Sequence, residues 1–373
     1  MRHSLIKAAI IISLIGAGQT GQAQGVRLTG TASQSFSLDN TGSGYDFDAV
    51  SSLGFGLNKR TRNTSVGLSS GLSMVVDQNG VTFSRPQLRF NFGYATKDVN
   101  YNGALSFARG PATIDVIQPD LSVLTYSGDR SVYSGNVGAS YALNNNTSMT
   151  VGISGTRTDY DPVSAGLVPS SNLSVTGGFS TQATPVTSYG ANAQLGFFEA
   201  ENASNTMSVS ADLSGTFSHQ LDQRTSLSGN LGLSFVETTD TFLGVETSNF
   251  TLSALFGLGA SYALPDGAIN IGLNQTVVPG SGGSLVINTS LGGSYSYQVN
   301  RAESLDLGVS LNRQENLGGG AQVTVVSISP SYSRQLTRDI NANANAYLQQ
   351  DNSGNSAHGF GVSLTRAFDF GLF

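Results

Sequence analysis

Alternation of apolar and polar residues is the feature that most constrains the fold of this chain. In residues 207–235, Met, Val, Leu and Phe take one parity while Ser, Asp and Thr take the other, on both sides of a polar break at 222–224. Side chains on a β-strand point to opposite faces with a period of two residues. The segment therefore predicts two antiparallel strands, each with one apolar and one polar face.

The same pattern recurs along the whole chain. Eighteen segments follow it, from residues 26–38 to residues 357–370. Every second connection is short, at 58–62, 96–98, 144–146, 181–186, 222–224, 265–267, 300–302 and 337–338, whereas the connections between these tend to be longer and richer in Gly, Pro and Asp. Short turns on one side and longer loops on the other are typical of outer-membrane barrels. The sequence therefore predicts an all-β fold: a single transmembrane antiparallel up-and-down β-barrel of 18 strands, with 16 strands as the alternative.

The first residues have a different character. Arg2 and Lys7 precede an apolar run at 8–15, and small residues stand at the end of the segment 21–23. This is the layout of a secretory signal, and its apolar run is too short to span a membrane as a helix. We expect residues 1–23 to be a cleaved signal peptide, with an anchor helix as the alternative, and residues 24–373 to form the barrel. Because the first strand begins directly after the signal, we expect no plug domain before it.

The amino-acid composition excludes several classes of function. Charged residues make up 11% of the chain, well below the roughly 25% of ordinary soluble domains. Residues 24–373 carry 16 basic and 24 acidic residues, a formal net charge of −8, and no Lys/Arg cluster indicates nucleic-acid binding. The absence of cysteine excludes disulfides, a lipoprotein anchor and thiolate metal sites. No His or carboxylate pair has metal-ligand spacing, so we expect no metal, no cofactor and no enzyme activity.

The polar faces favour a closed barrel over a soluble fold. Ser, Asn, Thr and Gly fill the polar parity, as Asn341, Asn343 and Asn345 illustrate, and such a face suits a hydrated lumen. Closure also removes the strand edges whose backbone groups lipid cannot solvate. A soluble propeller or β-helix is the alternative, but the sequence has no fixed blade or coil period.

Aromatic residues end many of the strands just before a short turn, at Tyr94, Tyr141, Phe217, Tyr262, Tyr297 and Tyr332. In this layout the chain resembles the porin-like outer-membrane β-barrels of Gram-negative bacteria, whose aromatic girdles lie at the membrane interfaces. The Tyr-Ala-Leu phrase before the breaks at 144 and 265 is also similar to barrel porins that accompany exopolysaccharide systems. The resemblance implies an outer-membrane location, contact with outer-membrane lipid and with the assembly machinery, and allows a homo-oligomer.

Outer-membrane proteins usually end in a Phe that the assembly machinery recognises, so Phe368, Phe370 and Phe373 are the candidate assembly signal. Phe373 is out of phase with the apolar parity of the last predicted strand, which contains Phe368 and Phe370. The working signal is therefore expected at Phe370, followed by a three-residue tail.

Charged residues on the polar parity are the candidate lining of a pore. A charge that faces lipid is costly, so a lumen-facing position is the cheaper one for Arg85, Arg89, Asp46, Asp48, Asp212 and Asp306. Most of these groups are expected to be solvated residues of the wall.

The long connection 109–131 has two interpretations. As a loop folded into the lumen, it would present Asp115, Asp120 and Asp129 to Arg85 and Arg89 across a constriction and so tune ion selectivity. As an external hairpin, it would extend the neighbouring strands and turn at 119–120, which its strand-like alternation favours.

These observations predict a channel for passive diffusion of small hydrophilic solutes or ions. A barrel of 16 to 18 strands leaves an aqueous channel, whereas side chains fill one of eight. The alternatives are a barrel component of a polysaccharide or surface export system and a closed structural or adhesive surface barrel.

Overall fold

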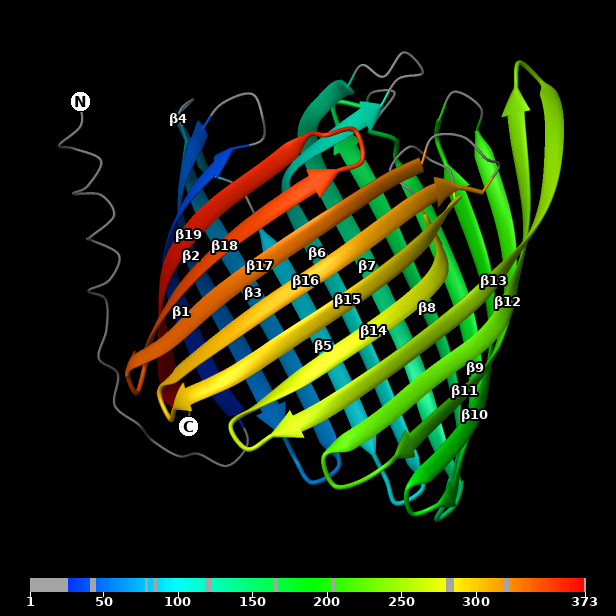
Figure 1. The fold of residues 1–373 in the computed structure, drawn as a ribbon, viewed down its shortest axis with the longest axis horizontal. Coiled ribbons are helices and arrows are strands. Elements are labelled where there is room, and N and C mark those ends of the chain that lie inside the picture. Colours follow the sequence, from blue (N-terminus) through cyan, green and yellow to red (C-terminus); the bar gives the residue numbers. More distant parts are fainter. Residues whose placement is uncertain are drawn as a thin grey trace.

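The computed structural model describes residues 26–40, 45–77, 80–83, 86–117, 123–163, 167–202, 205–279, 285–317 and 322–371. Almost all of them belong to one antiparallel sheet that closes into a barrel (Figure 1). In chain order its strands are β1 (Val26–Asn40), β2 (Tyr45–Arg60), β3 (Thr64–Asp77), β4 (Gly80–Phe83), β5 (Gln87–Ala95), β6 (Val99–Ile117), β7 (Val123–Asn144), β8 (Thr147–Asp161), β9 (Ser170–Thr184), β10 (Thr187–Ala200), β11 (Thr206–Gln220), β12 (Thr225–Phe242), β13 (Val245–Leu264), β14 (Gly267–Pro279), β15 (Leu285–Asn300), β16 (Glu303–Asn316), β17 (Gln322–Thr337), β18 (Ile340–Asp351) and β19 (Ser356–Gly371). No helix among the described residues is long and apolar enough to cross a membrane.

The wall contains 18 strands, because β4 and β5 are two pieces of one strand. Both pair with β3: β4 with Met74–Asp77 and β5 with Thr64–Gly71. Pro86, which has no backbone N–H to donate to a ladder, stands just before β5. The prediction of 18 strands is confirmed, and the alternative of 16 is wrong.

The barrel closes between its first and last strands. β1 pairs with β19 from Arg27↔Gly371 to Asn40↔His358, and on its other side with β2. Closure pairs the outermost strands with each other and leaves no free sheet edge along the wall. Because the number of strands is even, β1 and β19 run antiparallel, and the start of β1 lies beside the end of β19 on the same side of the barrel.

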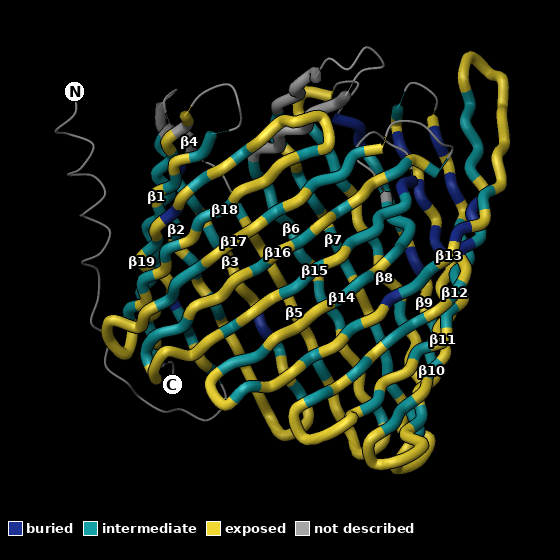
Figure 2. The backbone as a smooth tube through the Cα atoms, in the orientation of Figure 1, coloured by how far each residue is buried: buried dark blue, intermediate teal, exposed yellow. Residues whose placement is uncertain are grey.

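The two faces of the wall differ as the alternation predicts. On one set of alternating positions, here called the outward phase, large apolar side chains are solvent-exposed, and Leu231 at 72% is an example. The other set, the inner phase, carries mainly Ser, Thr, Asn and Gly. The buried residues of the described chain gather mostly near the long-connection ends of β9–β13 (Figure 2). The exposed apolar surface is therefore outside, where lipid rather than a protein core covers it.

Charged residues mark the borders of the apolar belt. On β16, Glu303 and Arg313 bracket four outward apolar residues, Leu305, Leu307, Val309 and Leu311. At about 3.4 Å per residue and a tilt of about 40°, this interval spans roughly 25 Å along the barrel axis, the height of an outer-membrane apolar band. Ion pairs lie at both borders: Arg334–Glu303 (3.3 Å) on the short-turn side and Arg313–Glu315 (3.0 Å) on the long-connection side.

The short turn between β11 and β12 is held by Asp222. Its carboxylate accepts hydrogen bonds from the backbone N–H groups of Arg224 (2.6 Å) and Thr225 (2.8 Å) and from the Thr225 hydroxyl (3.0 Å). The bond from Arg224 N–H is the main cause that lowers the pKa of Asp222 below its ordinary value. A lowered pKa means that the charged form stabilises the fold above the carboxyl's ordinary range, and that this stabilisation is lost as the pH falls through the folded-state pKa.

Replacing Asp222 is therefore expected to destabilise the barrel in a pH-dependent way. Asp222→Ala should lower the urea midpoint of unfolding at neutral pH, and the difference from the parent should shrink as acid protonates the parent carboxylate. Asp222→Asn keeps one acceptor oxygen and should fall between the two. Equal midpoints for parent and Asp222→Ala at neutral pH would show that the turn does not depend on this carboxylate.

Candidate channel and its constriction

The inner wall of the barrel is a surface of hydroxyl groups. Cross-strand pairs of inner-phase hydroxyls hydrogen-bond to each other around much of the circumference, at Ser106–Ser134 (2.6 Å), Ser154–Ser174 (2.7 Å), Ser188–Ser218 (2.8 Å), Ser226–Ser261 (2.6 Å) and Ser310–Ser327 (2.7 Å). Hydroxyls that pair across strands satisfy one another and still accept water. The wall is thus wettable while carrying little charge.

Two broad hollows follow this wall. One, of about 900 Å³, extends over β11–β17, and its lining includes the inner-phase residues Ser228, Asn230, Asn274 and Ser310 beside residues of the other phase such as Leu258 and Ile271. The other, of about 700 Å³, extends over β1–β6 and includes Ser52, Ser69 and Arg89. Small inner-phase side chains leave this space inside a wall of 18 strands.

The described candidate pore-lining charges take inner-phase positions but form no cluster. Arg89 lies on β5, Asp46 and Asp48 on β2, Asp212 on β11 and Asp306 on β16. No two of these four strands are neighbours in the wall. Arg85 lies outside the described residues.

Further charged residues share the inner phase and were not singled out from the sequence. Arg130 lies on β7, Asp39 on β1 and Asp240 on β12, where the Thr206 hydroxyl donates a hydrogen bond to Asp240 at 2.5 Å. Arg27 and Asp369 form an ion pair at 2.6 Å across the β1–β19 closure. Their position on the polar parity of their strands was the signal in the sequence that could have identified them as lumen-facing. Together with the predicted residues they make the inner phase more acidic than basic.

The segment 109–131 is mostly strand. Arg109 to Ile117 of β6 pairs with Val123 to Ser131 of β7, as the external-hairpin interpretation predicts. Asp129 does not face lumen arginines: it lies on the outward phase and forms an ion pair with Arg109 at 2.9 Å. This position corrects the proposed constriction role of Asp129. Asp115 lies in β6, and Asp120 lies outside the described residues.

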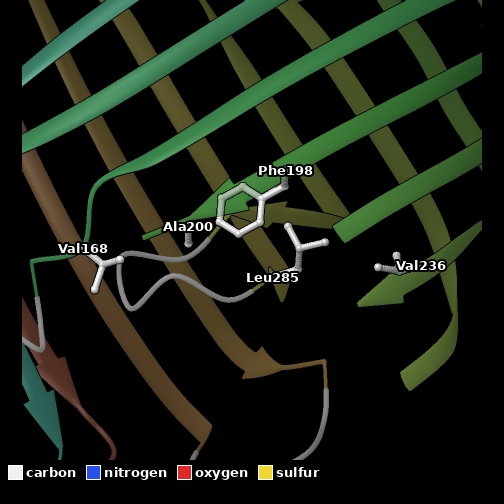
Figure 3. Close-up of a cluster of buried hydrophobic side chains, with 5 residues drawn as sticks. All are labelled: Val168, Phe198, Ala200, Val236 and Leu285. Carbon is white, nitrogen blue, oxygen red and sulfur yellow. The ribbon is translucent and has the colours of Figure 1, made fainter. Parts of the chain in front are cut away.

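Other segments narrow the barrel near its long-connection end. Val168, Phe198, Ala200, Val236 and Leu285 form a buried apolar cluster (Figure 3). Val277 and Leu317 pack against it. Phe198 is on β10 and Leu285 on β15, five strands apart in the wall, a separation of roughly 24 Å at about 4.8 Å per strand. Val236 of β12 and Val277 of β14 join the same cluster, so the β14–β15 end packs against inner-phase side chains of β10 and β12, while β15 stays paired with β16 from Val286 onward.

The β8–β9 connection contributes to the same inward cover. Leu167 is 0% exposed, and a side chain placed at Gly128 of β7 would meet Leu167 at 3.3 Å. Val168 joins the apolar cluster, and the carbonyl of Pro169 accepts a hydrogen bond from Glu201 N–H at 2.9 Å. Residues 167–169 therefore run along the inside of the wall from β7 to β10. Sequence reasoning missed both inward segments.

The candidate assembly residues lie on the last strand. Phe368 and Phe370 occupy the outward phase of β19, and their rings stack with centroids 6.0 Å apart. The Arg366 guanidinium lies 5.0 Å from the centre of the Phe368 ring. Phe373 lies outside the described residues, as does the predicted signal peptide 1–23.

Comparison with known proteins yields structural neighbours only. No protein-family model and no curated protein matches the sequence. The crystal structures of Pseudomonas aeruginosa OpdL and OpdO have TM-scores of 0.51 and 0.52 at 10% sequence identity; the matches cover 92% of this chain each, and 99% and 97% of those chains. Acinetobacter baumannii OccAB2 has a TM-score of 0.51 at 9% identity, covering 92% of this chain and 98% of that chain. The neighbours are outer-membrane porins. The closed wall of 18 strands, the apolar belt and these neighbours together show that the chain has the β-barrel fold of outer-membrane porins.

Proposed function

We propose that the protein is a channel for passive diffusion of small hydrophilic solutes or ions across the outer membrane. The observation that carries the proposal is the inner wall of paired serine hydroxyls, which faces hollows of about 900 and 700 Å³. A hydroxyl-lined surface hydrates easily and binds no single solute tightly, as a diffusion channel requires. The proposal includes no catalytic activity, cofactor or metal.

The charges of the wall support a preference for cations. The inner phase carries Asp39, Asp48, Asp212 and Asp306 against Arg89 and Arg130, with Arg27 already paired to Asp369. Carboxylates along a water-filled path raise the local concentration of cations and lower that of anions. The narrowing near the long-connection end makes solute size the second determinant of flux.

Single-channel recording of the refolded protein in a planar bilayer tests the proposal. We expect stable ohmic steps and a reversal potential that favours cations in a salt gradient. Arg89→Ala should increase the cation preference and Asp306→Asn should decrease it, because each changes one inner-phase charge. Arg313→Ala is the matched control, since Arg313 lies on the outward phase and pairs with Glu315.

The other outcomes separate the alternatives. A folded barrel that never conducts would overturn passive diffusion and favour a closed structural or adhesive barrel. Conductance that appears only with periplasmic partner proteins would favour a component of an export system. The proposal also includes outer-membrane lipid and the assembly machinery as partners, the latter acting on Phe368 and Phe370, and allows a homo-oligomer.

A further inference from the structure

The lipid-facing side of the wall has a hollow of its own, separate from the lumen. It has a volume of about 570 Å³ and extends over β5–β8. Eight of its eleven lining residues lie on the outward phase of these strands, and the other three are the residues between them, so the hollow opens to lipid. Its volume is several times the roughly 150 Å³ of an apolar cavity that binds benzene, which leaves room for a length of acyl chain.

Two glycines form the floor of this hollow. Gly135 of β7 and Gly155 of β8 are directly paired on the outward phase. The same row continues to Leu105 of β6 and to Leu173 of β9. A Cβ added to Gly135 would meet Leu105 Cδ2 at 2.9 Å, so the Leu105 side chain leans over the edge of the floor. The floor is therefore bare backbone between two leucine side chains.

Aromatic rings wall the hollow on the side of the long connections. Phe107 of β6 and Tyr133 of β7 are directly paired in the next outward row, and their ring centroids lie 5.0 Å apart. Arg157 of β8 continues this row beside Tyr133. Aromatic and basic side chains together are typical of the level at which lipid tails give way to head groups. The hollow therefore starts within the apolar belt and ends at the head-group level.

Arg157 brings charges of both signs to this end of the hollow. Its Nε donates a hydrogen bond to Asp159 Oδ1 at 3.0 Å, and its Nη2 donates one to Glu201 Oε1 at 3.2 Å. The three side chains are between 39% and 58% exposed. They are therefore accessible to the head group of a lipid.

A second guanidinium lies on the other side of β7. Arg109 of β6 forms one outward row with Ser131 of β7 and Asp159 of β8, and it pairs with Asp129 at 2.9 Å. Arg109 Nε is buried without a hydrogen-bond partner among the described residues. These ion pairs bring two guanidiniums and three carboxylates to the end of the hollow. A head group with only a phosphate would be repelled by the carboxylates, whereas one with a phosphate and an ammonium finds a partner for each group.

We propose that this hollow binds one phosphoethanolamine lipid of the outer membrane. One acyl chain lies over Gly135 and Gly155. The phosphate accepts hydrogen bonds from the two guanidiniums, and the ammonium group binds the carboxylates of Asp159 and Glu201. The site is on the outside of the wall, so it does not depend on whether the lumen conducts.

Native mass spectrometry tests the site on protein extracted from vesicles of phosphatidylethanolamine and phosphatidylglycerol. The parent should retain one phosphatidylethanolamine. Gly155→Leu should lose it, because the leucine side chain fills the floor. The backbone accepts this substitution, since a Cβ at Gly155 has its nearest contact at an ordinary 3.5 Å, to the Asn172 carbonyl oxygen.

Gly177→Leu is the matched control. Gly177 is an outward-phase glycine of β9, has no atom within 4 Å of its Cβ position and does not line the hollow. This variant should retain the lipid as the parent does. A parent that retains no lipid, or equal retention by Gly155→Leu and Gly177→Leu, would overturn the proposal.

Tryptophan fluorescence locates the acyl chain, because the protein contains no Trp. Phe90→Trp places a reporter on the β5 side of the hollow, and Leu213→Trp places a reference on the outward phase of β11. In phosphatidylcholine vesicles, chain-brominated phosphatidylethanolamine should half-quench Phe90→Trp at a mole fraction several-fold below that for Leu213→Trp. Adding Gly155→Leu should remove this difference. Equal quenching of the two reporters would overturn binding in the hollow.

The head group is tested with the same reporter. Chain-brominated phosphatidylglycerol, which has the phosphate but no ammonium, should quench Phe90→Trp and Leu213→Trp alike. Glu201→Gln combined with Asp159→Asn should reduce the preference for phosphatidylethanolamine. Soluble phosphoethanolamine should not relieve the quenching, because it has no chain to fill the hollow. Equal preference for the two lipids would overturn the role of the carboxylates, and relief by soluble phosphoethanolamine would overturn the role of the acyl chain.

Discussion

Replacing residues 276–288 by an Asn-Gly turn is expected to raise the single-channel conductance several-fold. Gln275 and Thr289 are directly paired across β14 and β15, so a two-residue turn can join them without changing the register. The deletion removes Val277 and Leu285, which pack with Phe198 and Val236 in the buried cluster. Because conductance depends on the narrowest cross-section, clearing this part of the lumen has a larger effect than changing one charge of the wall. Planar-bilayer recording measures the change.

Shortening the neighbouring hairpin is the matched control. Replacing residues 239–248 by Asn-Gly joins Thr238 to Asn249, which are also directly paired. This hairpin extends beyond the rest of the wall (Figure 1), so its loss should leave the conductance close to that of the parent. If the 276–288 deletion conducts no better than the control, the inward segments do not limit the flow of ions.

Leu231→Arg is expected to destabilise the barrel strongly although Leu231 is 72% exposed. Leu231 lies on the outward phase in the middle of the apolar run of β12, between Leu227 and Phe235. A guanidinium near the bilayer midplane costs about 2–4 kcal/mol. Urea unfolding of the protein in lipid vesicles should show this loss of unfolding free energy.

The adjacent residue supplies the control. Asn230→Arg places the same side chain on the inner phase, where Asn230 lines the hollow of about 900 Å³. Its unfolding free energy should stay close to that of the parent, because the lumen hydrates the charge. Equal destabilisation by the two substitutions would contradict the assignment of the outward phase to lipid.

The narrowing near the long-connection end is the feature of the lumen that the sequence did not predict. Alternation in 109–131 favours a hairpin, which the β6–β7 pairing confirms. Residues 268–277 and 284–298 alternate just as regularly, and they predict two ordinary wall strands. The local pattern indicates that such segments are strands but not that their ends join a buried cluster, because that depends on contacts with Phe198 and Val236, far away in the sequence.

The sequence by itself predicted the barrel, its 18 strands, and the division of each strand into an apolar and a polar face. These properties follow from a period of two residues, and lipid outside and water inside then fix the direction of every strand's apolar face. Only the tertiary structure decided where the lumen narrows, which charges pair, and that β13 and β14 separate above Phe256. Those features depend on strands that meet across the barrel, and the alternation of a single strand contains no information about its partners on the opposite side.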